Sequence, residues 1–186
     1  ASRLSEDPAC EVCLIEAGGM ATDPDIADPL KWPTLQGRAF DWDFKTLPQP
    51  FTAGRVHDWA RGRLLGGSSA INAMAHVRGH PDDFIPWAKA GGARWSYEGL
   101  LPGFMRSENF SGPASPERGT DGPFPVYLPG AEVSPLVRAY MAAGAGLGVP
   151  SLADHNGREL AGTAPNSLNI SNGRRVTVSD AYLPQA

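Results

Sequence analysis

The sequence has no long hydrophobic run, and this absence limits where the protein can work. A membrane-spanning helix needs about 20 consecutive apolar residues, and no segment of the 186 residues approaches that length. A signal peptide is also missing, although the chain does not begin with Met, so we expect its native start to lie outside this sequence. These absences predict a cytoplasmic protein without a membrane partner.

An excess of basic residues is missing as well. Lys and Arg number 16 against 20 Asp and Glu, which gives a net charge of -4 at pH 7, and no basic tract interrupts the chain. Nucleic-acid-binding proteins display basic patches or stripes. Nucleic acid is therefore not the expected partner.

Cysteine is scarce, and the two that occur, Cys10 and Cys13, have the spacing of a redox pair. The segment 10–15, however, is a short apolar run that predicts a strand, on which positions three apart face opposite sides. Reactive pairs of this spacing instead lie at a helix N-terminus. We therefore expect no redox role for these thiols.

Glycine and proline are abundant, with 22 and 18 residues spread along a chain that is 41% hydrophobic. This composition allows a packed core and predicts an architecture rich in loops. The length suits one domain or parts of two.

Apolar periodicity and turn signals predict a mixture of helices and strands. We expect helices over 69–75, 81–90, 96–108 and 134–147, a final helix capped by Ser179 or Asp180, and strands over 10–15, 124–128 and 163–170. Asn172-Gly173 predicts a tight hairpin turn that leads into a second strand over 174–178.

The most informative feature is the run from Trp59 to Met74, WARGRLLGGSSAINAM. Gly66 and Gly67 precede a predicted helix start, where glycines leave room for a pyrophosphate or an electron-rich ring to approach the backbone. The run does not match the phosphate loop of nucleotide hydrolases, because no Lys-Ser/Thr follows the glycines. A tight turn needed only for packing is the alternative.

Glu16 ends the predicted strand over 10–15 and is a candidate ligand of an adenosine ribose. In dinucleotide-binding folds such an acid lies about 20 residues beyond a glycine-rich turn. Here no glycine precedes Glu16, so we expect the first strand and its phosphate-binding turn to lie before Ala1. The alternative is an exposed glutamate without a ligand.

Several motifs occur in a fixed order along the chain. They are Glu16-Ala17-Gly18, the run from Arg61 to Met74, Val77-Arg78-Gly79, Gly122-Pro123, Ser134-Pro135-Leu136 and Arg175-x-Thr177-x-Ser179-Asp180-Ala181. Together they resemble the glucose–methanol–choline (GMC) family of flavin oxidoreductases. The resemblance covers nearly the whole chain.

The resemblance implies bound FAD and oxidation of a primary alcohol to an aldehyde, with a pyridoxine-like aromatic alcohol as the candidate substrate. Glu16 would hold the adenosine ribose, residues 59–67 would line the pyrophosphate and ribityl chain, and residues 72–74 would lie near the isoalloxazine. The implied cofactor-binding residues are Glu16, Ala17, Trp59, Arg61, Gly62, Arg63, Leu65, Gly66, Gly67, Ser68, Asn72, Ala73 and Met74. Some members attach the flavin through a histidine one residue before the asparagine. Ile71 occupies that position here, which excludes such a bond.

The same resemblance implies that the catalytic base, a histidine near the carboxyl end of full-length members, lies beyond Ala186. His57, His76, His80 and His155 all fall in the wrong part of the family's order, so we expect no catalytic residue in this chain. His76 and His80 are four apart, but the glycine and proline beside His80 disfavour a continuous helix. We therefore expect no metal site.

These observations predict an α/β chain, α+β overall, that is an internal fragment of a two-domain flavoprotein. Residues 1–109 would form part of a Rossmann-like FAD-binding domain, residues 110–178 would begin a mixed α+β substrate domain, and residues 179–186 would return toward the FAD-binding domain. One alternative is a non-catalytic fragment. Another is one chain of a split flavoprotein, whose partner chain would supply the base and the rest of the fold.

Overall fold

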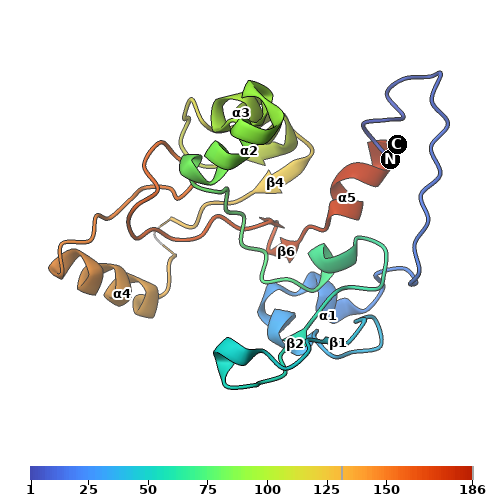
Figure 1. Cartoon of the computed structure of the whole chain (residues 1–186), viewed down its shortest axis with the longest axis horizontal. Helices are drawn as coiled ribbons and strands as arrows, with labels where there is room; N and C mark the ends of the chain where they lie inside the picture. The colour runs from blue at the N-terminus through green and yellow to red at the C-terminus, as the bar shows by residue number, and fades with distance from the viewer. Residues whose placement is uncertain (131, 186) are drawn as a thin grey trace. The chain divides into compact units, whose positions relative to one another are not determined.

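The computed structural model describes residues 1–130 and 132–185, which form short helices and strands joined by long loops (Figure 1). The chain divides into two compact units. The first unit contains Ala1–Met74 together with the segment from Ile170 onward, and the second contains Ala75–Asn169. No helix among the described residues is both long and apolar enough to cross a bilayer.

The first unit consists of short elements around a small core. Its α-helices are α1 (Pro24–Ala27) and α5 (Val178–Tyr182), and its strands form two antiparallel pairs, β1 (Phe44–Lys45) with β2 (Asp58–Trp59) and β5 (Ile170–Ser171) with β6 (Arg174–Arg175). Its 3-10 helices are η1 (Pro29–Thr34), η2 (Pro50–Thr52), η3 (Gly67–Ala70) and η6 (Leu183–Gln185).

Capping and burial explain how α1 is placed in this unit. The Asp23 carboxylate accepts a hydrogen bond from the amide of Asp25 at 2.9 Å, and Pro24 occupies the first turn. Ile26 then packs into the core. The other buried members of this core are Leu35, Leu64, Ala70 and Ile71, so the glycine-rich run supplies three of its side chains.

The second unit contains the longer helices. Its α-helices are α2 (Ile85–Gly91), α3 (Tyr97–Ser107) and α4 (Pro135–Gly146), with 3-10 helices η4 (Pro81–Phe84) and η5 (Ala93–Trp95) beside α2. Strands β3 (Glu108–Phe110) and β4 (Phe124–Val126) pair in parallel.

The sequence predicted these second-unit elements well. Ser96 caps α3 by accepting from the amide of Gly99, and Ser134 caps α4 ahead of Pro135 in its first turn. The helices expected over 81–90, 96–108 and 134–147 and the strand expected over 124–128 are confirmed within a few residues.

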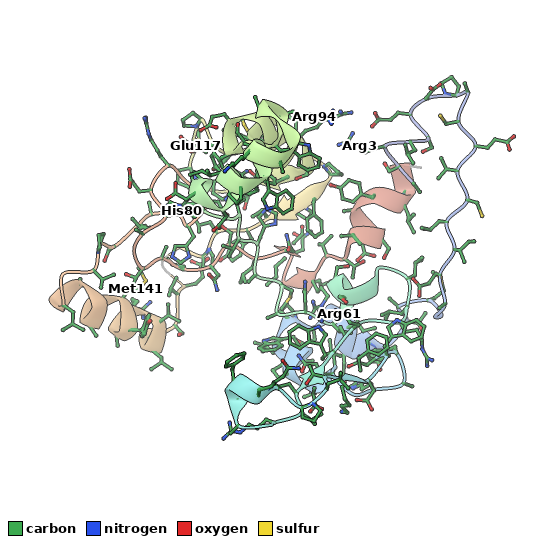
Figure 2. The ribbon with its side chains drawn as sticks, viewed as in Figure 1. Arg3, Arg61, His80, Arg94, Glu117 and Met141 are labelled. Carbon is green, nitrogen blue, oxygen red and sulfur yellow. The ribbon has the colours of Figure 1, made fainter. Side chains whose placement is uncertain are left out.

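The strand predicted over 10–15 is wrong. No described residue pairs with this segment, and Ile15 is 89% exposed. Figure 2 shows the segment as an extended trace with side chains on both sides. Apolar side chains on both faces are typical of a strand buried in a parallel sheet, and without neighbouring strands that propensity has no ladder to satisfy. Pairing begins only at Gly19, which forms a parallel bridge with Leu64.

The helix predicted over 69–75 is also wrong. The structure has only the 3-10 helix η3, and the backbone then turns away. Met74 has a φ of 60°, a left-handed conformation that cannot continue a right-handed helix.

The hairpin is confirmed, but its surroundings differ from the prediction. Asn172 and Gly173 have φ angles of 51° and 72°, as a two-residue hairpin turn requires, and Ile170 pairs with Arg175. The preceding strand expected over 163–170 is wrong except at its last residue, Ile170, which begins β5, because residues 163–169 form only isolated bridges. The partner strand is shorter than 174–178 and consists of β6.

The final helix is present, but its cap differs from the prediction. Thr177, and not Ser179 or Asp180, is the N-cap of α5. Asp180 completes a capping box with it, because a side chain three residues beyond the cap can reach back to the cap's amide.

Candidate functional site

Two of the motifs singled out in the sequence meet at one cavity in the first unit. Glu16, Leu65, Gly66 and Gly67 all line a cavity of about 280 Å³. The other lining residues are Ala1, Ser2, Leu14, Val178, Ser179, Tyr182 and Leu183. The lower end of the size range for ligand pockets is about 300 Å³, so this cavity suits part of a dinucleotide.

Backbone contacts explain why Glu16 reaches this cavity. Its Oε1 accepts a hydrogen bond from the amide of Gly18 at 2.8 Å, which turns the chain. The carbonyl of Gly19 then accepts from the amide of Leu65 at 2.8 Å. A Cβ at Gly18 would collide with the carbonyl of Arg63. Glycine is therefore required for the two motifs to lie side by side.

Gly66 and Gly67 have different surroundings. Both have left-handed φ angles, 95° and 54°. A Cβ on Gly66 would lie 2.8 Å from the hydroxyl oxygen of Ser179, whereas a Cβ on Gly67 would meet nothing within 4 Å. Gly67 therefore faces open space, although its amide already donates to the carbonyl of Leu64 at 2.8 Å.

The other residues between 59 and 68 that were expected to bind the cofactor do not line this cavity. The Arg61 guanidinium lies over the exposed Trp59 ring at 5.2 Å from its centroid. Arg63 lies over the ring of Trp42 at 5.4 Å. The amide of Gly62 donates to the hydroxyl of Ser68 at 3.2 Å. Ala17 is exposed beside Glu16.

Asp41 holds the backbone at the start of this run by hydrogen bonds. It is 7% exposed and accepts hydrogen bonds from the amides of Gly37, Asp43 and Arg61. Burial opposes its ionisation, but the three amide donors outweigh burial and hold the pKa of the carboxyl below its ordinary value. The ionised carboxylate thus anchors the backbone next to Arg61.

Asn72, Ala73 and Met74 form a separate turn after η3. Asn72 and Ala73 are exposed, whereas Met74 is 4% exposed. The side-chain oxygen of Asn72 accepts from the amide of Met74 at 2.9 Å. The same oxygen accepts from Nη1 of Arg175 at 2.9 Å.

The sequence did not predict a site role for the segment around α5. Ser179 and Tyr182 line the cavity, and Arg175 contacts the glycine-rich run. The motif Arg175-x-Thr177-x-Ser179 is visible in the sequence, but it lies more than 100 residues from the run that it contacts. The sequence contains no signal for that pairing.

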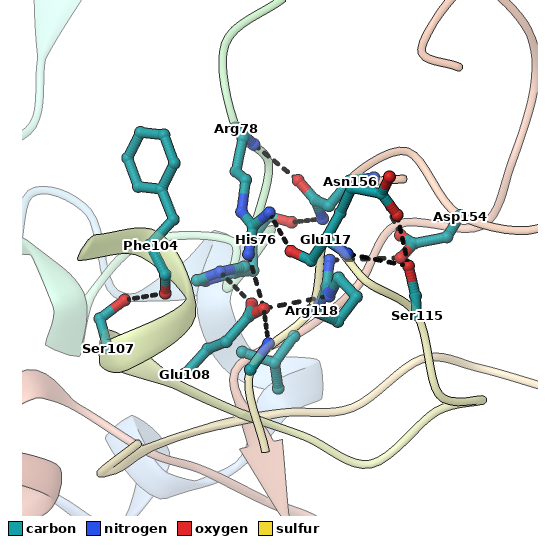
Figure 3. A network of polar contacts seen from close by, with 12 residues as sticks. His76, Arg78, Phe104, Ser107, Glu108, Ser115, Glu117, Arg118, Asp154 and Asn156 are labelled. Carbon is teal, nitrogen blue, oxygen red and sulfur yellow. Dashed lines mark hydrogen bonds and ion pairs between the residues drawn. The ribbon is translucent and has the colours of Figure 1, made fainter. Parts of the chain in front are cut away.

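Three histidines, His57, His76 and His80, have polar partners in the structure. His57 shares a hydrogen bond with Thr52 at 2.8 Å, and the Nδ1 of His80 caps η4 by accepting from the amide of Asp82. In the second unit, Nε2 of His76 lies 3.3 Å from a carboxylate oxygen of Glu108 (Figure 3). Among residues 1–130 and 132–185, no group of three or more His, Cys, Asp or Glu is arranged to hold a metal ion.

An exposed acid and a glycine-rich turn line one cavity in a chain of mixed helices and strands, and this combination is typical of proteins that bind a dinucleotide cofactor. Residues 13–186 match the family model described as GMC oxidoreductase. The chain belongs to this family of oxidoreductases, and the predicted α/β class with part of an FAD-binding domain is confirmed.

Pyridoxine 4-oxidases are among the relatives of this chain. The pyridoxine 4-oxidase of Microbacterium luteolum is 55% identical over 184 residues, which cover 98% of this chain and 36% of the relative. The crystal structure of pyridoxine 4-oxidase from Mesorbium loti has a TM-score of 0.93 and 55% identity, with the same coverage. The chain thus spans about a third of the length of these relatives.

Family membership indicates FAD as the cofactor. A structure of Aspergillus oryzae RIB40 formate oxidase that concerns FAD modification matches with a TM-score of 0.82 and 26% identity, covering 98% of this chain and 34% of that one. The cavity fits part of such a cofactor, because Gly67 leaves space where a side chain would intrude and the Glu16 carboxylate can accept hydrogen bonds from hydroxyls.

Proposed function

We propose that this chain forms the flavin-binding part of a longer FAD-dependent oxidoreductase that oxidises a primary alcohol to an aldehyde. The observation that carries the proposal is the cavity lined by both Glu16 and the Gly66–Gly67 turn. When bound, FAD supplies the acceptor for the hydride of the alcohol carbon, while the hydroxyl proton leaves to a base.

The residues of the cavity have distinct proposed tasks. Glu16 accepts hydrogen bonds from the adenosine ribose, and Ala17 lies beside it. Gly66 and Gly67 let the pyrophosphate approach the backbone closely, because neither has a Cβ. Leu65, a partly buried residue of the same wall, excludes water from that contact.

In this proposal the other residues of the run contact the part of the cofactor that extends beyond the cavity. Trp59, Arg61, Gly62, Arg63 and Ser68 border the pyrophosphate and ribityl chain. Arg61 and Arg63 are exposed and each stacks on an aromatic ring, so their positive charges are held in place and remain available to phosphate oxygens.

The turn at residues 72–74 borders the isoalloxazine ring. Asn72 and Ala73 are exposed and can contact a ligand, while the buried Met74 fixes the turn. No residue of this chain is proposed as the base. We propose that a histidine carried by another part of the polypeptide takes that role.

The candidate substrate is an aromatic primary alcohol of the pyridoxine kind. The support is the 55% identity to a pyridoxine 4-oxidase over 184 residues. That identity lies in the part of the relative that this chain covers, so the remainder of the polypeptide also takes part in selecting the alcohol in this proposal.

Exposed apolar side chains support the proposal that further polypeptide completes the fold. Ile15, which precedes Glu16, is 89% exposed, and Leu136, Tyr140 and Leu147 of the α4 region are 80%, 71% and 85% exposed. Such surfaces are costly in water and are typical of faces covered by another part of a protein.

We propose residues 1–109 as part of the FAD-binding domain, 110–178 as the beginning of the substrate domain and 179–186 as a return to the first.

The experiment is purification of the longer polypeptide that carries this chain, followed by its visible spectrum and an anaerobic titration with alcohols. A flavin band that bleaches on addition of pyridoxine, but not of an aliphatic alcohol such as ethanol, is the expected result. A protein that remains colourless after incubation with FAD and removal of the unbound cofactor would overturn the proposal. A flavin band that no primary alcohol bleaches would overturn the reaction but leave the cofactor.

The split-chain alternative has its own test. This chain is produced alone and then mixed with a second chain that carries the carboxyl-terminal part. Flavin binding and alcohol turnover that appear only after mixing would support two-part assembly. Flavin binding by this chain alone would show that the partner is not needed for the cofactor site.

A further inference from the structure

Arg175 is the most deeply buried cation of the first unit that has no acidic partner among the described residues. It is 4% exposed. Its Nε donates to the carbonyl of Ile26 at 2.8 Å, and its Nη1 donates to the carbonyl of Ser69 at 3.1 Å and to the side-chain oxygen of Asn72 at 2.9 Å. All three acceptors are neutral, and the buried Nη2 has no hydrogen-bond partner in the described structure.

Burial without a carboxylate lowers the pKa of Arg175 to about 10. The guanidinium is therefore still protonated near neutral pH. Burying an uncompensated charge is strongly unfavourable, and a neutral side chain could fill this volume at lower cost. The retained charge therefore points to a task beyond packing.

Two of the three hydrogen bonds of Arg175 are made with the glycine-rich run. They reach the end of η3 through the carbonyl of Ser69 and the following turn through Asn72. Asn72 in turn accepts from the amide of Met74, whose φ is 60°. A left-handed conformation is unfavourable for a non-glycine residue, so these hydrogen bonds are needed to hold the turn.

A second contact from the same segment holds η3 in place. The amide of Val178, at the start of α5, donates to the hydroxyl oxygen of Ser69 at 3.0 Å. That hydroxyl donates to the carbonyl of Gly66 at 2.5 Å. The segment from Arg175 to Val178 is therefore linked by hydrogen bonds to the Asn72–Met74 turn through Asn72 and to the Gly66 turn through Ser69.

We propose that Arg175 is a positioning residue of the flavin site, which fixes the Asn72–Met74 turn and places one uncompensated positive charge behind it. This inference rests on the proposed function. It goes beyond that function by assigning a task to a residue that does not line the cavity. A positive charge behind the turn stabilises negative charge on a ligand at the turn, and so favours the reduced state of a bound flavin.

The test compares Arg175→Met, Arg175→Lys and the matched control Arg174→Met in the longer flavin-loaded polypeptide. Arg174 is the exposed neighbour of Arg175 on the same strand, β6, so its replacement removes a charge without touching the run. The readouts are the dissociation constant for FAD, the midpoint potential of the bound flavin and the thermal unfolding temperature.

We expect Arg175→Met to lower the midpoint potential and to weaken FAD binding about tenfold or more. Arg175→Lys keeps the charge but cannot donate to the three acceptors in the same geometry. It should therefore restore the potential while FAD binding stays weakened. Arg174→Met should change neither quantity.

A wild-type potential in a folded Arg175→Met protein, or wild-type FAD affinity in Arg175→Lys, would overturn the inference. If Arg175→Met does not fold, the FAD affinity and the midpoint potential of Arg175→Lys test the inference alone. Failure of the wild-type polypeptide to bind FAD would instead overturn the proposed function. The two failures are therefore distinguishable.

Discussion

In the second unit, the Arg78 guanidinium donates through Nη2 to Oε1 of Glu108 at 2.6 Å, and both side chains are almost completely buried, at 3% and 0% exposed (Figure 3). The same carboxylate oxygen accepts from the amide of Gly119 at 2.9 Å and lies 3.2 Å from Nε of Arg118. Glu108 thus joins segments from three parts of the unit, and two arginines depend on its charge.

Replacement of Glu108 should destabilise the protein strongly. Glu108→Gln keeps the shape of the side chain but leaves Arg78 and Arg118 buried without their counter-charge. Removal of one partner from a buried pair costs about 3–5 kcal/mol. Chemical denaturation, followed by intrinsic fluorescence, measures this loss.

The matched control is Glu159→Gln, an exposed glutamate of the same unit. Its effect should stay within about 0.5 kcal/mol of the wild type. Equal losses for the two variants would contradict the role assigned to Glu108.

Stability should also decrease in acid. Burial raises the pKa of Glu108, but the His76 ring 3.3 Å away, the amide of Gly119 and the charges of Arg78 and Arg118 outweigh burial, so the pKa lies below its ordinary value. A carboxyl whose pKa is depressed on folding stabilises the folded state above its unfolded pKa of about 4.3, and this stabilisation is lost as the pH falls through the folded value.

We therefore expect the unfolding free energy of the wild type to fall below about pH 4.3 more steeply than that of Glu108→Gln. The measurement is a series of denaturation curves between pH 3 and 7. Parallel pH dependences for the two proteins would contradict the depressed pKa.

The two adjacent glycines should respond differently to the same substitution. Gly67→Ala places a Cβ in open space, so only the left-handed φ of 54° opposes it, at a cost of about 1–2 kcal/mol. Gly66→Ala meets the same kind of backbone penalty, with a φ of 95°, and its Cβ also lies 2.8 Å from the hydroxyl of Ser179. It should destabilise more, as thermal unfolding would reveal.

Removal of that hydroxyl should recover part of the loss. In the double variant Gly66→Ala with Ser179→Ala, the 2.8 Å approach to the Ser179 hydroxyl disappears, while the backbone penalty and the approaches to Thr177 at 3.2 and 3.3 Å stay. An unfolding temperature no higher than that of Gly66→Ala alone would argue against the packing of α5 on the glycine turn.

The sequence predicted the parts of this fold that depend on neighbouring residues. The cap Ser134 with Pro135, and the turn Asn172-Gly173, each carry their signal within a few positions. The strand over 10–15 was predicted wrongly because a strand depends on partners that local propensity does not describe.

The candidate site shows the same contrast between features signalled by neighbouring residues and features that depend on distant ones. Glu16 and the Gly66–Gly67 turn were singled out from residue type and order, and the structure places them on one cavity. Arg175 was missed as a site residue, because its contacts with Ser69 and Asn72 span more than 100 positions. Only folding brings that guanidinium to the run.

The dissociation constant of FAD for Glu16→Gln tests most directly whether Glu16 belongs to an FAD site. Glu16 is exposed, so its replacement should leave the fold intact, and Glu11→Gln on the same extended segment is the control. Hydrogen bonds to a charged group contribute about 1.5–3 kcal/mol, so Glu16→Gln should weaken FAD binding about tenfold to a hundredfold while Glu11→Gln leaves it unchanged. Equal affinities for FAD in the wild type and both variants would show that Glu16 is not part of the FAD site.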